Sequence, residues 1–380
     1  MKEYIIVGAG LTGAVVARCL ADAGHSVLVL ERRGHIAGNL YDEYCDLGFL
    51  VQRYGPHVFH TNSERAYEFI KKYGEWDDYF LECSVYMKGK FTPSPFNFQT
   101  ADDYFELGKA EAIKAALRAQ YGGRERVSVT ELLESSDSSV KEFADFLFDS
   151  DYKPYTAKQW GVSPSEIDAS VLKRVPVLLS YETGYFTDRY QCLPRGGYTR
   201  FIKRLLSHKN IKIKLKTDAL PLISIKDGSV FFRGKKPTGA LVYTGAADEL
   251  LATKYGALPY RSLRFKYETH ACQSYQKSAV VAYPEEKDYT RITEYTKLPR
   301  QNTANGTIIA KEYPEPYSHG SEPYYPIPTE KSAALYEKYR CELEKIPNLI
   351  LCGRLADFKY YNMDAALLRA LEIADGILKK

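Results

Sequence analysis

The stretch that decides the fold is Tyr4-Ile5-Ile6-Val7-Gly8-Ala9-Gly10-Leu11-Thr12-Gly13, and a second apolar run follows it and ends at Glu31. Four apolar residues predict a buried strand, and the glycines let the chain turn tightly from that strand into a helix. Gly8 permits the turn, Gly10 lets a pyrophosphate approach the backbone, and Gly13 lets the helix pack close to the sheet. Glu31 stands where a carboxylate accepts hydrogen bonds from ribose hydroxyls. The pattern predicts a dinucleotide-binding Rossmann-like unit.

The residues that follow Glu31 favour FAD over NAD as the dinucleotide. They read Arg32-Arg33-Gly34-His35-Ile36-Ala37-Gly38-Asn39, a small-residue turn typical of FAD proteins, although Ala37 stands where a glycine is usual. Near the other end, residues 348–352 predict a strand, Gly353-Arg354 its turn, and residues 364–378 an amphipathic helix. Arg354 suits the phosphates of the cofactor. We expect FAD to contact Gly8, Gly10, Thr12, Gly13, Glu31, Arg32, Gly38, Asn39, Arg354 and Met363.

Composition sets loose bounds on the class of protein. The chain has 380 residues, 45% hydrophobic and 26% charged, which is ordinary for a globular protein with two or three cores. The net charge of +4 is mild, and the lysines and arginines look scattered, so we expect no nucleic-acid partner. The N-terminal apolar segment is the glycine-broken strand itself, so we expect no signal peptide, no membrane span and a cytoplasmic location.

Cysteine and histidine patterns argue against a structural metal. Seven widely spaced cysteines include no C-x-x-C, which argues against a disulfide framework and a zinc site. His57 and His60 are three residues apart, but no cysteine or acidic cluster accompanies them, so we expect no metal. The unusual count is 32 tyrosines, whose rings and hydroxyls suit a pocket for a nucleotide and a sugar.

The order of segments predicts an α/β fold in which an FAD-binding Rossmann-like domain carries an inserted helical domain and an inserted antiparallel β-sheet domain. Residues 102–159 read as helical, with a helix start at Thr130, whereas residues 172–193 and 263–325 read as short antiparallel strands. A helix over residues 198–206 and a strand over 241–245 return the chain to the cofactor domain. We expect FAD-binding segments at 1–84, 196–246 and 333–380, sheet-domain segments at 85–101 and 247–332, a helical domain at 102–160, and a mobile loop with sheet-domain strands at 161–195.

Eight motifs in order make the whole chain resemble the bacterial UDP-galactopyranose mutase family. They are Tyr54-Gly55-Pro56-His57-Val58-Phe59-His60-Thr61-Asn62, Tyr155-Thr156-Ala157-Lys158-Gln159-Trp160-Gly161, Leu172-Lys173-Arg174-Val175-Pro176-Val177, Tyr185-Phe186, Tyr289-Thr290-Arg291-Ile292-Thr293-Glu294, Lys311-Glu312-Tyr313-Pro314, Glu322-Pro323-Tyr324-Tyr325-Pro326 and Gly353-Arg354-Leu355. The resemblance implies an FAD enzyme that interconverts UDP-galactopyranose and UDP-galactofuranose with no net redox change. It also implies that N5 of the reduced flavin attacks the anomeric carbon, expels UDP and carries the opened sugar as an iminium while the ring recloses.

The resemblance also implies roles for individual residues. Arg174 and Arg291 match the family's pair of arginines on the diphosphate, and planar guanidinium groups pair well with phosphate oxygens. Tyr185, Tyr325 and Tyr360 match its hydroxyl donors to the diphosphate, Tyr155 would stack on uracil, and Trp160 would line the sugar side. The resemblance further implies that His57, His60 and Tyr360 contact the FAD, with a histidine backbone carbonyl, from His57 or His60, beside flavin N5. A general-base role for the histidine ring is the less favoured alternative. We include Asn97, from a loosely matched segment, among the substrate contacts.

Some alternatives remain open. The family motif Tyr-x-Asp-Met reads Tyr360-Tyr361-Asn362-Met363 here, and an amide keeps the shape of the carboxylate but not its charge. A relative acting on UDP-N-acetylgalactosamine or on a dTDP-6-deoxysugar therefore fits as well. An amine-oxidase-like oxidoreductase shares the cofactor fold but has no need of two phosphate-binding arginines. A flavin-binding protein without turnover leaves the tyrosine and arginine motifs without purpose.

The remaining expectations concern motion and partners. Residues 163–170 are polar and small, and the reaction must exclude water, so we expect residues 162–174 to form a lid that UDP orders through Arg174. We further expect a UDP-sugar substrate, an external reductant such as NAD(P)H, and a homodimer.

Overall fold

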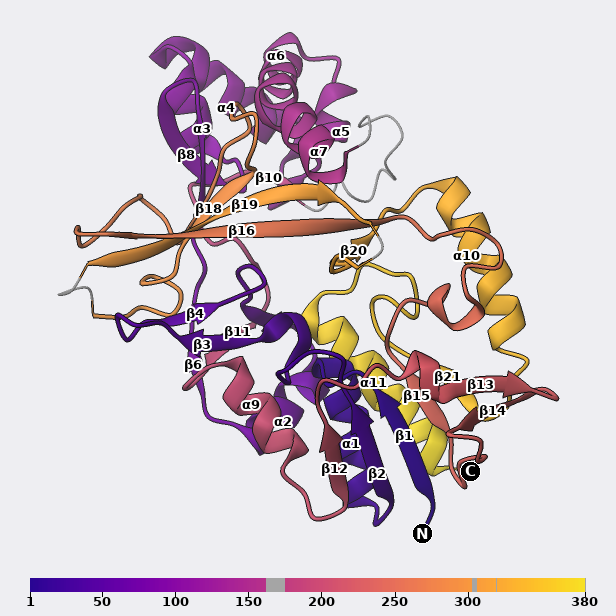
Figure 1. Ribbon diagram of the computed structural model, residues 1–380. Coiled ribbons are helices and arrows are strands. Elements are labelled where there is room, and N and C mark those ends of the chain that lie inside the picture. Colours follow the sequence, from indigo (N-terminus) through magenta and orange to yellow (C-terminus); the bar gives the residue numbers. More distant parts are fainter. Residues whose placement is uncertain (162–174, 303–305, 319, 380) are drawn as a thin grey trace.

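The computed structural model describes residues 1–161, 175–302, 306–318 and 320–379. Two long strands cross the middle of the molecule and separate a helical part from the dinucleotide-binding part, which holds both chain termini (Figure 1). The lid expected over residues 162–174, with Arg174, lies outside the described residues.

The dinucleotide-binding part is built on a parallel sheet whose five strands lie in the order β12-β2-β1-β15-β21. Its strands and their bounds are β1 (Glu3–Val7), β2 (Ser26–Leu30), β12 (Ile211–Lys214), β15 (Leu241–Tyr243) and β21 (Leu349–Leu351). Helices α1 (Leu11–Asp22), α9 (Tyr198–Leu206) and α11 (Met363–Leu378) pack into one core with α2 (Glu64–Tyr73). Strands expected from four distant segments thus meet in one sheet, and the Rossmann-like fold is confirmed.

The opposite face of this sheet has a core of its own. Ile5, Leu241 and Leu349 are buried there against Val230 of a two-stranded hairpin and Tyr339 of a helix. The hairpin is β13 (Ile223–Lys226) with β14 (Ser229–Phe232), and the helix is α10 (Glu330–Leu343).

Helix α1 ends as expected before Gly24, which has a φ of +85°.

The sheet domain contains seven strands in the order β20-β16-β19-β18-β17-β7-β8. Its strands are β7 (Cys83–Met87), β8 (Lys90–Ser94), β16 (Tyr260–His270), β17 (Val280–Ala282), β18 (Arg291–Glu294), β19 (Thr307–Pro316) and β20 (Tyr325–Pro326). The expectation of an antiparallel sheet needs one correction, because β17 pairs with β7 in parallel.

The helical part follows β8 directly. Its helices are α3 (Phe98–Tyr104), α4 (Leu107–Tyr121), α5 (Val129–Leu133), α6 (Ser138–Leu147) and α7 (Lys153–Trp160), with a π-helical turn over Phe148–Tyr152 before α7. The helix start expected at Thr130 is wrong by two residues. Ser128 is the N-cap, because its side chain and that of Glu131 satisfy each other's backbone amides in a capping box.

Several short strands lie outside both large sheets. Strand β10 (Val177–Leu178) pairs with β9 (Arg126–Val127), and β11 (Tyr190–Pro194) pairs with β5 (Phe59–Thr61) and β6 (Trp76–Asp78). Strand β3 (Asp42–Tyr44) pairs with β4 (Leu50–Gln52). Residues 161–195 were expected to add strands to the sheet domain, and this is wrong for β10 and β11. Their backbone partners come from the helical and dinucleotide-binding parts instead.

Candidate active site

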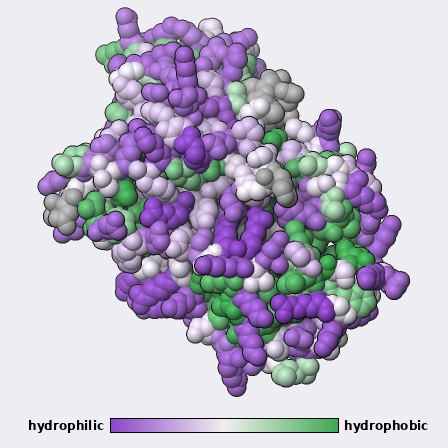
Figure 2. Space-filling model, in the orientation of Figure 1, coloured by the Kyte–Doolittle hydropathy of each residue, from purple (hydrophilic) through white to green (hydrophobic). Residues whose placement is uncertain are grey.

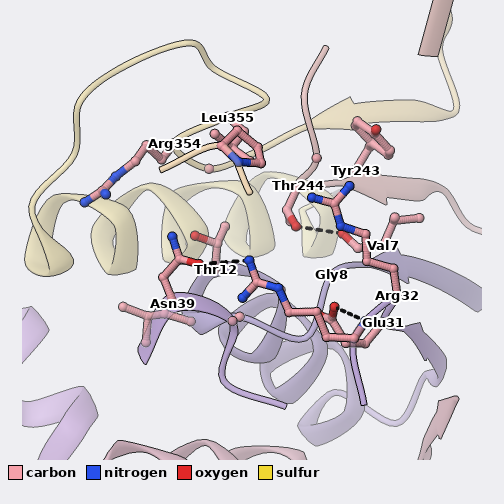
Figure 3. Close-up of a pocket in the computed structure, with 18 of the residues that line it drawn as sticks. Val7, Gly8, Thr12, Glu31, Arg32, Asn39, Tyr243, Thr244, Arg354 and Leu355 are labelled. Carbon is pink, nitrogen blue, oxygen red and sulfur yellow. Dashed lines mark hydrogen bonds between the residues drawn. The ribbon is translucent and has the colours of Figure 1, made fainter. Parts of the chain in front are cut away.

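A cavity of about 230 Å³ opens at the carboxyl ends of β1, β2 and β15. Figure 3 shows Gly8, Glu31, Thr244 and Arg354 around it, contributed by segments far apart in the sequence. Of the thirteen residues expected to contact the cofactor, eleven line this cavity, and His60 and Tyr360 do not. The eleven are Gly8, Gly10, Thr12, Gly13, Glu31, Arg32, Gly38, Asn39, His57, Arg354 and Met363.

Backbone sterics explain the glycines that begin this cavity. Gly8 has a φ of +104°, and a Cβ there would lie 2.1 Å from Oγ1 of Thr244. A Cβ on Gly13 would lie 2.0 Å from the carbonyl oxygen of Gly8, so any side chain would push α1 away from the turn. Ala37, in place of the usual glycine, adopts φ +76°, a strained conformation for a residue with a Cβ.

Glu31 fixes the turn at the base of the cavity. One carboxylate oxygen accepts a hydrogen bond from the backbone N–H of Ala9 at 2.9 Å, and the other accepts one from the backbone N–H of Arg33 at 2.9 Å. Each carboxylate oxygen has a further lone pair, so these bonds are compatible with a ribose hydroxyl as an additional donor.

Arg33 is a cavity residue that no sequence motif indicated. Its guanidinium is held by Glu322, with a 3.2 Å contact from Nε, and by the Asn39 side chain, 2.9 Å from Nη2. Within the described part of the chain, its buried Nη1 has no hydrogen-bond partner. An unsatisfied cationic donor in a cavity lining suits an anionic group such as a diphosphate. Residues 217–220 also line the cavity and carry no local motif that could have revealed them.

Three aromatic residues from separate segments form a cluster beside this cavity. The rings of Trp160 and Tyr325 meet edge to face at 5.0 Å, and the ring of Tyr360 lies 6.0 Å and 5.6 Å from them. The Tyr325 hydroxyl contacts the Gln159 side-chain amide. The Arg354 guanidinium lies 5.0 Å from the centre of the Tyr360 ring. Because Arg354 also lines the cavity, it connects the aromatic cluster to the dinucleotide site.

Arg291 lies in this region as half of an ion pair with Glu312. Its Nε and Nη2 both lie 2.8 Å from Oε2 of Glu312, whose side chain is 2% exposed, whereas Arg291 itself is 29% exposed. Burial would lower the pKa of Arg291, but the facing carboxylate outweighs it and raises the pKa. Among the described residues, Nη1 has no partner, so this guanidinium can still bind an anion.

The two histidines differ in their surroundings. Burial first, and then the charges of Arg354 and Arg291, lower the pKa of His57 to about 3. Nδ1 of its ring donates to the carbonyl of Gly55 at 2.9 Å, which opposes this lowering only in part, so the imidazole is neutral near pH 7. The His57 backbone carbonyl accepts hydrogen bonds from the side chains of Gln52 and Tyr198.

His60 lies outside the cavity. Its Nδ1 lies 2.7 Å from Asp188, and its ring stacks on Phe186 with a 3.7 Å centroid distance.

The remaining residues expected to contact the substrate differ in their surroundings. Burial raises the pKa of the Tyr155 phenol, and the positive charge of Arg291 opposes this increase. Tyr155 and Arg291 therefore lie in the same region. The ring of Tyr185 packs edge to face on Phe186, 4.9 Å away. Asn97 needs a correction because it is fully buried as the N-cap of α3, where it binds the Gln99 amide and donates to the carbonyl of Glu182.

Comparison with known proteins identifies the family. The model of the family described as UDP-galactopyranose mutase matches residues 151–360, and a model of NAD(P)-binding Rossmann-like domains matches residues 6–73. A probable UDP-galactopyranose mutase of Klebsiella pneumoniae is 34% identical over 99% of this chain and 95% of its own length. A dTDP-fucopyranose mutase of Escherichia coli is 32% identical over 100% of this chain and 99% of its own.

A solved structure shares the fold. The crystal structure of a reduced UDP-galactopyranose mutase superimposes with a TM-score of 0.75 at 16% identity, covering 100% of this chain and 94% of the other. No helix within the described residues is both long and apolar enough to cross a membrane. The family match over residues 151–360, the full-length relatives and the dinucleotide cavity together establish that this chain belongs to the UDP-galactopyranose mutase family.

Proposed function

We propose that the protein interconverts UDP-galactopyranose and UDP-galactofuranose, with FAD as its cofactor in the reduced form and no net redox change. The full-length similarity to a probable UDP-galactopyranose mutase supports this reaction. Family membership also favours a mutase over an amine-oxidase-like oxidoreductase or a flavin-binding protein without turnover.

The observation that carries the proposal is the contact between Arg354 and Tyr360. Arg354 borders the dinucleotide cavity, and Tyr360 belongs to the aromatic cluster with Trp160 and Tyr325. A sugar bound against these aromatic rings would therefore lie next to the cofactor, as a reaction between the two requires.

Arg291 would bind the diphosphate of the substrate. Glu312 holds Nε and Nη2 and keeps the guanidinium charged, whereas Nη1 remains available to a phosphate oxygen. A departing nucleoside diphosphate carries about two negative charges, so a preorganised cation stabilises it as it leaves. The resemblance assigns the second cation to Arg174. Tyr185, Tyr325 and Tyr360 would donate hydroxyl hydrogen bonds, and Tyr155 would stack on the base.

The cavity fits a dinucleotide such as FAD. The glycine turn exposes the amide end of α1, which has no acidic residue in its first turn, and the free Nη1 of Arg33 adds a cationic donor for the diphosphate. Glu31 would accept from the ribose. When bound in reduced form, the flavin would supply the nucleophile for the anomeric carbon.

A second candidate substrate is a dTDP-linked 6-deoxysugar. The dTDP-fucopyranose mutase of Escherichia coli covers this chain as completely as the Klebsiella pneumoniae relative and is almost as similar. Asn362 lines the cavity where the family motif has a carboxylate, which also leaves UDP-N-acetylgalactosamine open.

The direct test incubates the purified protein, reduced with dithionite, with UDP-galactofuranose, dTDP-fucofuranose or UDP-N-acetylgalactofuranosamine, and follows the pyranose forms chromatographically. We expect yellow protein containing FAD, turnover of UDP-galactofuranose only when reduced, and slower turnover of the other two sugars. Faster turnover of either would reassign the substrate. Colourless protein that binds NAD but cannot be loaded with FAD would refute the cofactor.

We further propose NAD(P)H as the external reductant, a homodimer as the assembly, and the cytoplasm as the location. Stopped-flow reduction by NADH and NADPH, light scattering and cell fractionation test these points in turn.

A further inference from the structure

The positive charge of this protein is concentrated in one segment, residues 209–236, which we call the basic segment. It contains eight lysines and arginines but only two acids, Asp218 and Asp227, although the whole chain has a net charge of +4. The basic residues are therefore denser here than in the rest of the chain. The segment includes β12 and the β13–β14 hairpin, and its basic residues are Lys209, Lys212, Lys214, Lys216, Lys226, Arg233, Lys235 and Lys236.

These charges are not compensated within the described part of the chain. None of the eight residues takes part in an ion pair there. Lys236 donates to the Ser229 hydroxyl at 2.9 Å, and Arg233 lies over the ring of Phe232 at 5.5 Å. Elsewhere exposed cations are often paired, as Arg195 is with Asp77. Lys209, Lys212, Lys214 and Lys216 lie on or next to β12, one edge of the five-stranded sheet, whereas the β13–β14 hairpin, on or next to which the other four lie, is bonded to Asn348 beside β21, the opposite edge. Unpaired like charges repel one another, so the four lysines at the β12 edge gain most from an anionic surface.

Strand β12 places aliphatic side chains among these charges. It is an edge strand of its sheet and pairs only with β2, where Lys212 is opposite Leu28 and Ile213 is opposite Val29. Because side chains alternate along a strand, lysines lie on one face of this edge and aliphatic residues on the other. Ile213 and Leu215 are each 38% exposed, unusually high for aliphatic residues next to a core. Figure 2 shows hydrophobic residues gathered over the dinucleotide-binding part, with hydrophilic side chains among them.

We propose that this edge of the sheet docks on an anionic lipid surface. In an edge-on approach both faces of this strand border the membrane, so Ile213 and Leu215 would enter the headgroup region on one side while the lysines on the other side extend to lipid phosphates and carboxylates. Such binding would be peripheral and would not depend on the reaction assigned above.

Two other roles explain fewer features of the basic segment. One is protection of the sheet edge against pairing with other strands, and the other is nucleic-acid binding. Lysines on an edge strand discourage pairing with other strands, which also disfavours a second copy of this chain as the partner. That reason does not extend to the exposed Ile213 and Leu215. Nucleic-acid surfaces favour arginines and free aromatic rings, whereas the segment has one arginine, and it already covers Phe232.

The test is sedimentation of the full-length, cofactor-loaded protein with vesicles of phosphatidylcholine alone or with about a third of phosphatidylglycerol. We expect at least tenfold stronger binding to the anionic vesicles, weakened severalfold by raising the salt from about 50 to 300 mM. The combined variant Lys209→Gln, Lys212→Gln, Lys214→Gln, Lys216→Gln should lose about tenfold or more. The matched control changes four exposed lysines outside the segment, Lys88, Lys109, Lys153 and Lys266, to Gln and should bind within about twofold of wild type.

Three results would overturn the proposal. They are equal binding of wild type to both kinds of vesicle, an equal loss in both variants, and displacement from anionic vesicles by millimolar inorganic phosphate, which would indicate a free-phosphate site. Tighter binding of a duplex DNA than of the vesicles would instead assign the face to nucleic acid. The comparison of lipids and salts uses wild-type protein, so it decides the question even if a variant fails to fold.

Discussion

Arg291 of β18 and Glu312 of β19 are direct cross-strand neighbours, and the carboxylate holds two nitrogens of the guanidinium at 2.8 Å. The ion pair holds the Arg291 guanidinium, which comes from the sheet domain, in the region that also contains the Tyr155 phenol. It also explains how an arginine that is 29% exposed can have a fixed orientation.

Replacing Arg291 with Ala should reduce turnover by at least about a hundredfold, because loss of one charge-assisted phosphate contact in the transition state costs roughly 3 kcal/mol. Cofactor content should stay normal. Arg264→Ala is the matched control, since Arg264 also lies in this sheet and pairs with a glutamate, Glu315. Steady-state kinetics of the reduced enzyme measure the loss of turnover. Near-native activity of the Arg291 variant would show that Arg291 does not bind the diphosphate.

Lys158 should position the turn that precedes Arg291. Its ammonium on α7 lies 2.8 Å from each of the carbonyl oxygens of Tyr283 and Tyr289 and also contacts two carbonyls between them, so four acceptors share its three N–H groups. We expect Lys158→Met to reduce kcat/KM by about tenfold or more and to increase hydrogen exchange over residues 283–289. Lys153→Met is the control, because Lys153 lies on the same helix but is 61% exposed. Unchanged exchange in the Lys158 variant would show that the turn is held by other contacts.

The neutral state of His57 should make stability depend on pH. Burial, with Arg354 and Arg291, lowers its pKa to about 3, whereas an unfolded histidine titrates near 6.5. The unfolded state therefore binds more protons between these values, so stability is complete above about pH 6.5 and falls as the pH is lowered. Each pH unit in that window should cost up to about 1.4 kcal/mol.

Denaturant unfolding of the cofactor-free protein between about pH 4.5 and 7.5 measures this dependence. His57→Asn should flatten the curve relative to wild type. His25→Asn serves as the control, because His25 directly precedes β2 and its ring packs against Tyr4. The same slope in wild type and in the His57 variant would contradict a buried neutral imidazole.

Gly13 should tolerate no side chain. A Cβ there would meet the Gly8 carbonyl at 2.0 Å, so Gly13→Ala should destabilise the protein by about 1–3 kcal/mol or more and weaken cofactor binding. Gly376→Ala is the control because Gly376 also lies within a helix, and no atom lies within 4 Å of its added Cβ. That variant should be neutral or more stable by up to about 1 kcal/mol. Thermal unfolding and cofactor absorbance measure both effects, and equal behaviour of the two variants would refute the close contact.

The sequence by itself determined the parts of this protein that depend on local sterics and periodicity. The glycine spacing from Gly8 to Gly13 and the apolar run over Ser26–Leu30 allow few conformations other than strand, turn, helix and strand, and the structure has that unit. The helix over Tyr198–Leu206 was likewise readable, because its apolar residues recur at the helical period.

Only the tertiary structure decided which distant groups meet. Arg33 is held by Glu322, 289 residues away, and the register of β18 against β19 gives Arg291 its carboxylate. Asn97, expected at the substrate, became the cap of α3 because a short polar side chain before a helix satisfies its free amides. Such pairings depend on packing and on strand register between segments far apart in the chain, and no local pattern of residues encodes either.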